Sequence, residues 1–175
     1  MVFDLDPFAP AGLKEAIRVA LLRKKVLDRL GLESCPKRSG ATGFHVYVPI
    51  APRYTFAIAR KFAGVIGRWL LAEHPRLITM EWAIAKRPGK VFFDHQMNTQ
   101  GKTVASVYSP RPMPGASVSV PLRWDEVHPN LDPRDFTIRI RTMGRRLREV
   151  GDLFEPVLRR QQLLEPAIAR FSQGL

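Results

Sequence analysis

The sequence predicts a domain of mixed α/β class, because patterns typical of strands and of helices alternate along its 175 residues. Short runs such as Val2–Asp6 and Phe44–Ile50 alternate apolar and polar residues, as half-buried strands do. Two longer runs, residues 12–30 and 55–73, repeat apolar residues at helical spacing. A chain of this length can bury one hydrophobic core, so we expect a single domain over residues 1–175.

The rest of the chain divides less clearly, because proline, glycine and serine are frequent between residues 98 and 121. We expect Trp82, Phe92 and Phe93 to belong to the core. The C-terminal part is basic and helical in pattern, and Pro166 is expected to break it into two pieces. Further strands are expected at residues 80–85, 90–94, 104–108 and 136–141.

The composition points to a polyanionic partner. The chain has 28 Lys and Arg against 16 Asp and Glu, a formal net charge of +12. Such a surface attracts nucleic acid, and we expect no membrane association, because the longest apolar stretch is interrupted by Arg68. The single cysteine, Cys35, excludes an internal disulfide and fits a reducing cytoplasm.

Two carboxylates stand at the start of the chain. Asp4 and Asp6 follow the apolar pair Val2-Phe3. On a strand they point to the same face with Cα atoms about 6.6 Å apart. Like charges held this way favour a divalent cation between them, so the pair is a candidate Mg²⁺ or Mn²⁺ site for phosphate chemistry. A solvated turn at Pro7 is the alternative.

A glycine-rich loop precedes the second strand pattern and reads Ser39-Gly40-Ala41-Thr42-Gly43-Phe44-His45. Glycines allow backbone N–H groups to approach an anion, and the side chains of Ser39 and His45 add donors. Lys37, just upstream, adds positive charge. The loop is therefore a candidate triphosphate cradle, although an ordinary turn before a strand has the same composition.

Two further residues are candidates from their positions. Asp94 ends the apolar run Val91-Phe92-Phe93 and could be a third metal ligand. Arg111, in Tyr108-Ser109-Pro110-Arg111, could hold a phosphate in bidentate fashion. Each residue in isolation also fits an ordinary strand end or a solvent-facing loop.

The order of these four motifs along the chain resembles the polymerase domain of bacterial ligase D. That domain belongs to the archaeo-eukaryotic primase superfamily and acts in non-homologous end joining. Additional matching text includes His45-Val46-Tyr47-Val48-Pro49, Asn98 and Val120-Pro121-Leu122 with Trp124-Asp125-Glu126. The resemblance extends from Phe3 to about Asp152.

The resemblance implies a two-layer primase-polymerase core, a largely antiparallel sheet with the two long helices on one face. It implies a nucleotidyltransferase that extends a DNA 3′-hydroxyl, in end-joining repair or priming. Asp4, Asp6 and Asp94 would hold two Mn²⁺ or Mg²⁺ ions, and Ser39, Gly40, Gly43, His45 and Arg111, with Lys37, would bind the nucleotide. Expected partners are NTP or dNTP, DNA as primer-template, gaps or double-strand-break ends, and a ligase or end-binding protein.

Three departures from the family pattern stand out. Ala41 and Thr42 replace the usual glycine and lysine of the loop, which leaves Lys37 or Arg38 to supply the positive charge. His95-Gln96-Met97-Asn98 replaces the usual Tyr-Leu-x-Asn. The segment that usually precedes the Asp-x-Asp strand, and that grips a 5′-phosphate, is expected to be missing.

Two other functions are compatible with the sequence alone. A phosphatase of the haloacid-dehalogenase type would use Asp4 as nucleophile, Asp6 as general acid and Asp152 in a late metal motif. Pro7 after the Asp-x-Asp pair is unusual for that class. A non-catalytic, basic nucleic-acid-binding module would explain the charge equally well, but not the three acidic residues.

Overall fold

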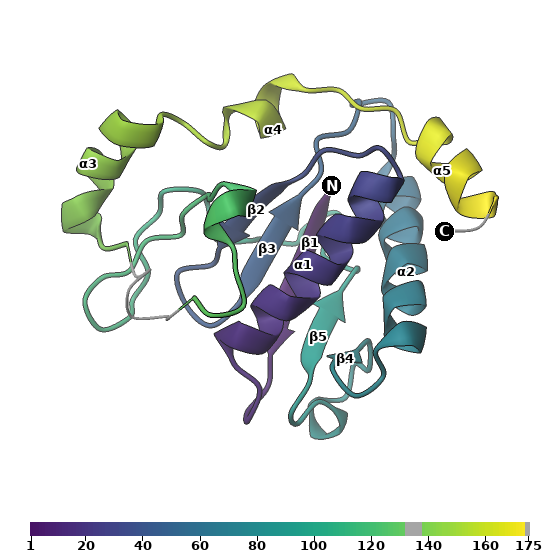
Figure 1. Cartoon of the computed structure of the whole chain (residues 1–175), viewed down its shortest axis with the longest axis horizontal. Helices are drawn as coiled ribbons and strands as arrows, with labels where there is room; N and C mark the ends of the chain where they lie inside the picture. Colours follow the sequence, from purple (N-terminus) through teal and green to yellow (C-terminus); the bar gives the residue numbers. More distant parts are fainter. Residues whose placement is uncertain (132–137, 174–175) are drawn as a thin grey trace.

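The computed structural model describes residues 1–131 and 138–173. One five-stranded sheet with the order β2-β3-β1-β5-β4 forms its centre (Figure 1). Strand β1 pairs antiparallel with β3 and β5, and β3 pairs antiparallel with β2. Only β4 runs parallel to its neighbour β5. The strands are β1 (Val2–Pro7), β2 (Cys35–Arg38), β3 (Phe44–Tyr47), β4 (Ile78–Thr79) and β5 (Val91–Asp94).

Two long helices cover one face of the sheet, as the sequence predicts. Helix α1 (Leu13–Arg29) begins where the Glu15 carboxylate accepts a hydrogen bond from the Gly12 N–H, at 2.7 Å. It ends before Gly31, whose φ of +71° suits the left-handed turn after a helix. Helix α2 (Phe56–Glu73) is capped by the Thr55 hydroxyl, which accepts from the Ile58 N–H at 3.3 Å.

The pleat of β1 separates an apolar face from a charged one. Phe3 and Leu5 are fully buried beneath the helices, whereas Asp4 and Asp6 point away from them. The ring of Phe93 on β5 packs edge-on against Phe3, with centroids 5.6 Å apart, and lies against Gly67 of α2. The mixed α/β fold and the two-layer arrangement expected from the resemblance are therefore confirmed.

The second half of the chain differs from several sequence predictions. Residues 80–85 form a loop and the short 3₁₀ helix η1 (Ile84–Lys86), not a strand. No strand is present over residues 104–108, where backbone hydrogen bonds are local or reach residue 119 across a loop. Part of the strand expected at 136–141 lies outside the described residues, and Ile140 begins a helix instead. Trp82 is 57% exposed rather than in the core, although Phe92 and Phe93 are buried as expected.

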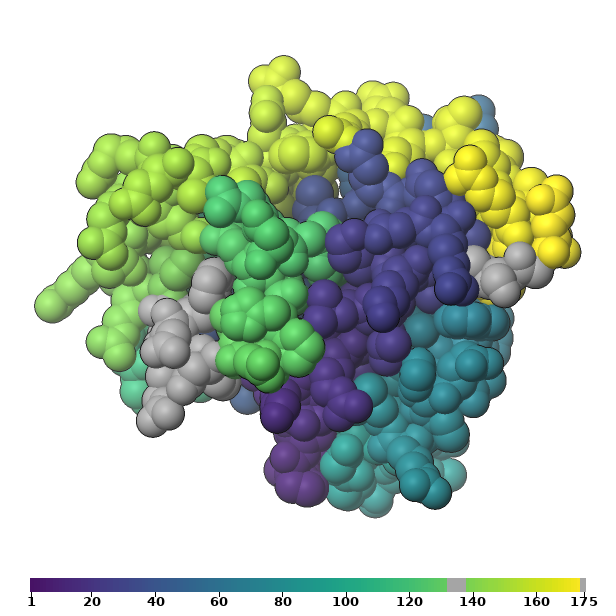
Figure 2. All heavy atoms as spheres, viewed as in Figure 1, coloured from purple at the N-terminus to yellow at the C-terminus, as the bar shows by residue number. Residues whose placement is uncertain are grey.

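The C-terminal part contains three helices rather than two. They are α3 (Ile140–Val150), α4 (Glu155–Arg159) and α5 (Glu165–Ser172). Pro166 lies in the first turn of α5, where a missing N–H costs nothing, and the breaks fall at residues 151–154 and 160–164. These segments form a band along one edge of the molecule, yellow-green to yellow in Figure 2. Among the described residues, no helix is both long and apolar enough to cross a lipid bilayer.

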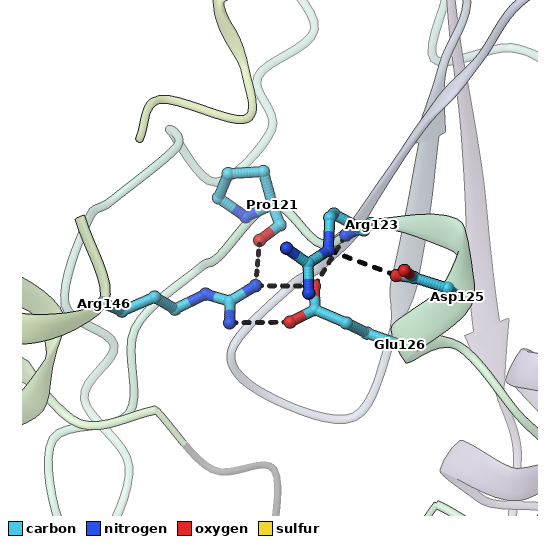
Figure 3. A network of polar contacts seen from close by, with 5 residues as sticks. All are labelled: Pro121, Arg123, Asp125, Glu126 and Arg146. Carbon is cyan, nitrogen blue, oxygen red and sulfur yellow. Dashed lines mark hydrogen bonds and ion pairs between the residues drawn. The ribbon is translucent and has the colours of Figure 1, made fainter. Parts of the chain in front are cut away.

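A largely buried ion pair ties helix α3 of this band to the rest of the molecule. Arg146 of α3 donates two hydrogen bonds to the Glu126 carboxylate, at 2.7 and 2.8 Å, and a weaker one to the Pro121 carbonyl (Figure 3). Both side chains of the pair are only 14% exposed. Glu126 belongs to the 3₁₀ helix η2 (Trp124–Glu126), so the contact fixes α3 against η2.

Candidate active site

Four side chains from four strands form one row on the charged face of the sheet. The register aligns Lys37 of β2 with His45 of β3, His45 with Asp4 of β1, and Asp4 with Asp94 of β5. Directly opposed residues of antiparallel strands point to the same face. Asp94, ninety positions later in the chain, is therefore the cross-strand neighbour of Asp4, as the motif order predicts.

The three aspartates interact electrostatically. Burial, followed by the charges of Asp4 and Asp94, raises the pKa of Asp6 to about 6 against the opposing effect of Arg87. His45 Nε2 lies 3.3 Å from Asp4 Oδ1, and burial lowers the pKa of this histidine despite the carboxylate beside it. The lowered pKa favours the uncharged form of the His45 ring, so this histidine contributes little positive charge to offset the carboxylates.

The donor set fits a hard divalent cation in its chemistry. All three residues offer carboxylate oxygens, the ligands that Mg²⁺ and Mn²⁺ prefer. Asp4 Oδ1 is buried, and its contact with His45 Nε2 lacks the geometry of a good hydrogen bond. Asp94 Oδ1 accepts from the Gln96 N–H at 2.8 Å. In the described part of the chain, no three His, Cys, Asp or Glu side chains converge tightly enough to form a ready-made cluster. Ion binding would thus require the side chains to draw together.

The glycine-rich loop lies directly against the acidic residues. A Cβ at Gly43 would lie 2.9 Å from Asp6 Oδ1 and 3.5 Å from Ser39 Oγ. Gly40 has a φ of +79°, and a Cβ there would lie 2.7 Å from Arg111 Cγ. Only glycine permits either approach. The loop predicted from sequence to bind an anion therefore contacts both the metal-site candidates and Arg111.

Three basic or polar side chains complete the cluster. The buried Lys37 ammonium donates to the Ala105 carbonyl at 2.9 Å and to Ser119 Oγ at 2.5 Å. Burial lowers the pKa of Lys37 to about 8, with Asp4 opposing and Arg111 reinforcing the shift. The half-buried Arg111 has an Nε with no hydrogen-bond partner among the described residues. Ser39 Oγ accepts from the Ala41 N–H at 3.2 Å. The cationic groups of Lys37 and Arg111 lie beside the carboxylates, an arrangement suited to a metal-bound anion.

Two residues near the site were not chosen as site residues from the sequence. The Asn98 amide accepts from the Val2 N–H at 2.8 Å and donates to the Val2 carbonyl at 2.7 Å, which holds the start of β1. Arg87 stacks 3.5 Å above the ring centre of Phe92, the cross-strand partner of Asp6. Asn98 falls in the text that matches the family, which is the only signal that the sequence offers. Arg87 gives no such signal, because its position depends on how the loop before β5 folds.

A family model of the LigD primase-polymerase domain matches residues 1–154. The chain belongs to this family. It is 35% identical over 139 residues to the bifunctional non-homologous end joining protein LigD of Bacillus subtilis, covering 79% of this chain. It is 33% identical over 157 residues to the multifunctional LigD of Mycolicibacterium smegmatis, covering 90% of this chain.

The solved structure of the polymerase domain of Mycobacterium tuberculosis ligase D in complex with DNA has the same fold. The TM-score is 0.81 at 30% sequence identity, and the match covers 90% of this chain and 54% of the other. The chain spans about a fifth of the length of the curated relatives, 23% for the Bacillus protein and 20% for the Mycolicibacterium protein. The resemblance stated from the motifs is therefore confirmed at the level of the family and the fold.

Proposed function

We propose that the chain is a metal-dependent nucleotidyltransferase that adds ribonucleotides or deoxyribonucleotides to a DNA 3′-hydroxyl, in end-joining repair or priming. Family membership supports the reaction class. The single observation that carries the proposal is the cross-strand row of Lys37, His45, Asp4 and Asp94, with Asp6 beside it against the glycine-rich loop.

Asp4, Asp6 and Asp94 would hold two Mn²⁺ or Mg²⁺ ions. Such ions, when bound, lower the pKa of an attacking hydroxyl and neutralise charge on the leaving pyrophosphate. The carboxylates would fix these ions on the strand face, and the raised pKa of Asp6 is consistent with a site that needs cations. Asp94, at the end of β5, is the residue we assign to the ion nearest the 3′-hydroxyl.

The triphosphate would lie over the glycine-rich loop. Gly40 and Gly43 allow close approach of the backbone, and Ser39 and His45 offer a hydroxyl and a ring N–H. Arg111 and Lys37 supply positive charge, and Lys37 is fixed by the Ala105 carbonyl and Ser119. The task of these side chains is to position the phosphates and stabilise charge as it develops.

Incubation with labelled NTP, a DNA primer-template and Mn²⁺ tests the proposal directly. We expect template-dependent extension by the intact chain and none by Asp4→Ala. If the intact chain binds DNA but forms no product with either Mn²⁺ or Mg²⁺, the non-catalytic, basic binding module becomes the better description.

The phosphatase alternative lacks support. The family model that matches residues 1–154 is of the primase-polymerase class instead. Asp152, which would serve as its late metal ligand, instead accepts a hydrogen bond from the Tyr108 hydroxyl.

A further inference from the structure

Trp82 is an exposed aromatic side chain on the catalytic side of the sheet. Its indole is 57% exposed and packs edge-on against Phe92, with ring centres 6.0 Å apart at 71°. Phe92 is directly opposite Asp6 in the β1–β5 register, so its ring points to the face that carries the aspartates. Trp82 therefore packs against the cross-strand neighbour of Asp6, and more than half of the residue is exposed to solvent.

The loop that carries Trp82 is held in place by Arg87. The guanidinium donates from Nε to the Glu81 carbonyl at 2.9 Å and from Nη2 to the Trp82 carbonyl at 2.6 Å. It also stacks on Phe92 at 3.5 Å and lies 4.9 Å from the ring centre of Phe8. These contacts fix the backbone on both sides of the indole. The loop is thus ordered before any ligand binds, so a base that stacks on Trp82 need not bring about the entropy loss of ordering it.

A lysine lies beside the exposed ring. Lys102 Nζ is 5.4 Å from the centre of the Trp82 ring, within the range of a cation–π contact. Lys102 is exposed and makes no ion pair with a carboxylate in the described part of the chain. A largely exposed aromatic ring with an ammonium beside it is a combination that binds a nucleobase and its phosphate.

We propose that Trp82 is a stacking platform for a nucleobase of the DNA held at the active centre, with Lys102 beside the attached phosphate. The inference rests on the proposed function, because it takes DNA as the ligand of this face. Stacking on Trp82 would be independent of the base sequence, because every base presents a π face. Trp82 is thereby a DNA-positioning residue and not a ligand of the metal or the triphosphate.

The test compares Trp82→Ala, Trp82→Phe and Ile84→Ala, each in the whole 175-residue chain. Ile84 is the matched control, because it is 69% exposed on the same loop and offers no aromatic face. The affinity for a fluorescein-labelled hairpin primer-template is measured by anisotropy in Mn²⁺ without nucleotide. Tryptophan emission is recorded in the same titration with unlabelled hairpin, and thermal midpoints confirm that each variant is folded.

We expect Trp82→Ala to weaken the affinity for the hairpin about tenfold, while Trp82→Phe retains most of the affinity and Ile84→Ala retains all of it. DNA should quench the emission of the wild-type protein, and Trp82→Phe should lose that quenching while Trp69 and Trp124 remain. The slope of log affinity for the hairpin against log salt concentration should become shallower in Lys102→Ala, by the amount expected for about one lost phosphate contact.

An affinity of Trp82→Ala within twofold of the wild type would overturn the stacking platform, even if primer extension proceeds normally. One further outcome would separate the stacking proposal from the polymerase proposal. Quenching that depends on Trp82, in a protein that extends no primer under any condition, would support the platform and overturn the polymerase assignment.

Discussion

The two faces of strand β1 differ in character, because one is apolar and the other is charged. Phe3 and Leu5 are fully buried beneath α1 and α2, whereas Asp4 and Asp6 gather with Asp94 on the other face. Close packing stabilises the apolar face. On the charged face, burial and the neighbouring charges of Asp4 and Asp94 raise the pKa of Asp6 to about 6. The comparison teaches that alternate residues of one strand carry stability and chemistry separately.

The largest effect should come from neutralising the charged face. Asp6→Asn removes one carboxylate from the cluster and should reduce nucleotide incorporation at least about 10²-fold. Its stability in urea without added metal should equal or exceed that of the wild type, because a repelling charge is gone. Asp125→Asn, which alters an exposed carboxylate, is the control for activity. If Asp6→Asn lowers the free energy of unfolding as well as the rate of nucleotide incorporation, the two faces do not serve separate roles.

The apolar face should respond in the opposite way. Leu5→Ala deletes a fully buried side chain and should lower the free energy of unfolding by about 2–5 kcal/mol. Activity per folded molecule should change little at temperatures well below the midpoint. Urea unfolding followed by circular dichroism measures the loss. A loss below about 1 kcal/mol would mean that the core under β1 is looser than the structure shows.

The glycine-rich loop can be probed with a pair of glycines that share one backbone conformation. Gly40 and Gly101 both have a φ of +79°, but only at Gly40 would a Cβ meet Arg111 Cγ and the backbone of residues 118 and 119. Gly40→Ala should therefore lower the free energy of unfolding by about 1–3 kcal/mol and raise the KM for NTP. Gly101→Ala should lower the free energy of unfolding by less, because it adds backbone strain alone. Similar KM values for the two variants would contradict the contact between loop and Arg111.

A smaller effect should follow from Lys37 on the charged face. Burial lowers its pKa from 10.5 to about 8, so between these values the unfolded chain binds more protons than the folded one. Stability therefore rises with pH across this window. The thermal midpoint of the wild type, measured from pH 7.5 to 10, should rise relative to that of Lys37→Met. Parallel curves for the two proteins would show that Lys37 keeps its ordinary pKa in the fold.

The sequence predicted best the elements with strong periodicity. The strand at β1 and both long helices were found within one or two residues, because one apolar face repeats at a fixed spacing in each. Strand β2 (Cys35–Arg38) was missed, since Pro36 and the adjacent basic residues conceal its pattern. It pairs with β3 as a hairpin whose turn is the glycine-rich loop.

The candidate site was predicted by motif order rather than by local pattern. Nothing near Asp94 reveals that it pairs with Asp4, because the register of the sheet decides this. The strand expected at residues 80–85 was wrong for a related reason. Arg87 donates hydrogen bonds to the carbonyls of Glu81 and Trp82, and these bonds stabilise a loop where the residue pattern alone suggests a strand. The same contact exposes Trp82, which apolar character had assigned to the core.

The central claim is that Asp4, Asp6 and Asp94 act together to bind divalent cations. Titration with Mn²⁺, with free ion measured by electron paramagnetic resonance, tests it in the wild type, Asp4→Asn and Asp94→Asn, with Asp125→Asn as control. The account predicts that Asp94→Asn loses Mn²⁺ binding as fully as Asp4→Asn, while the control binds like the wild type. Wild-type Mn²⁺ affinity in Asp94→Asn would contradict it.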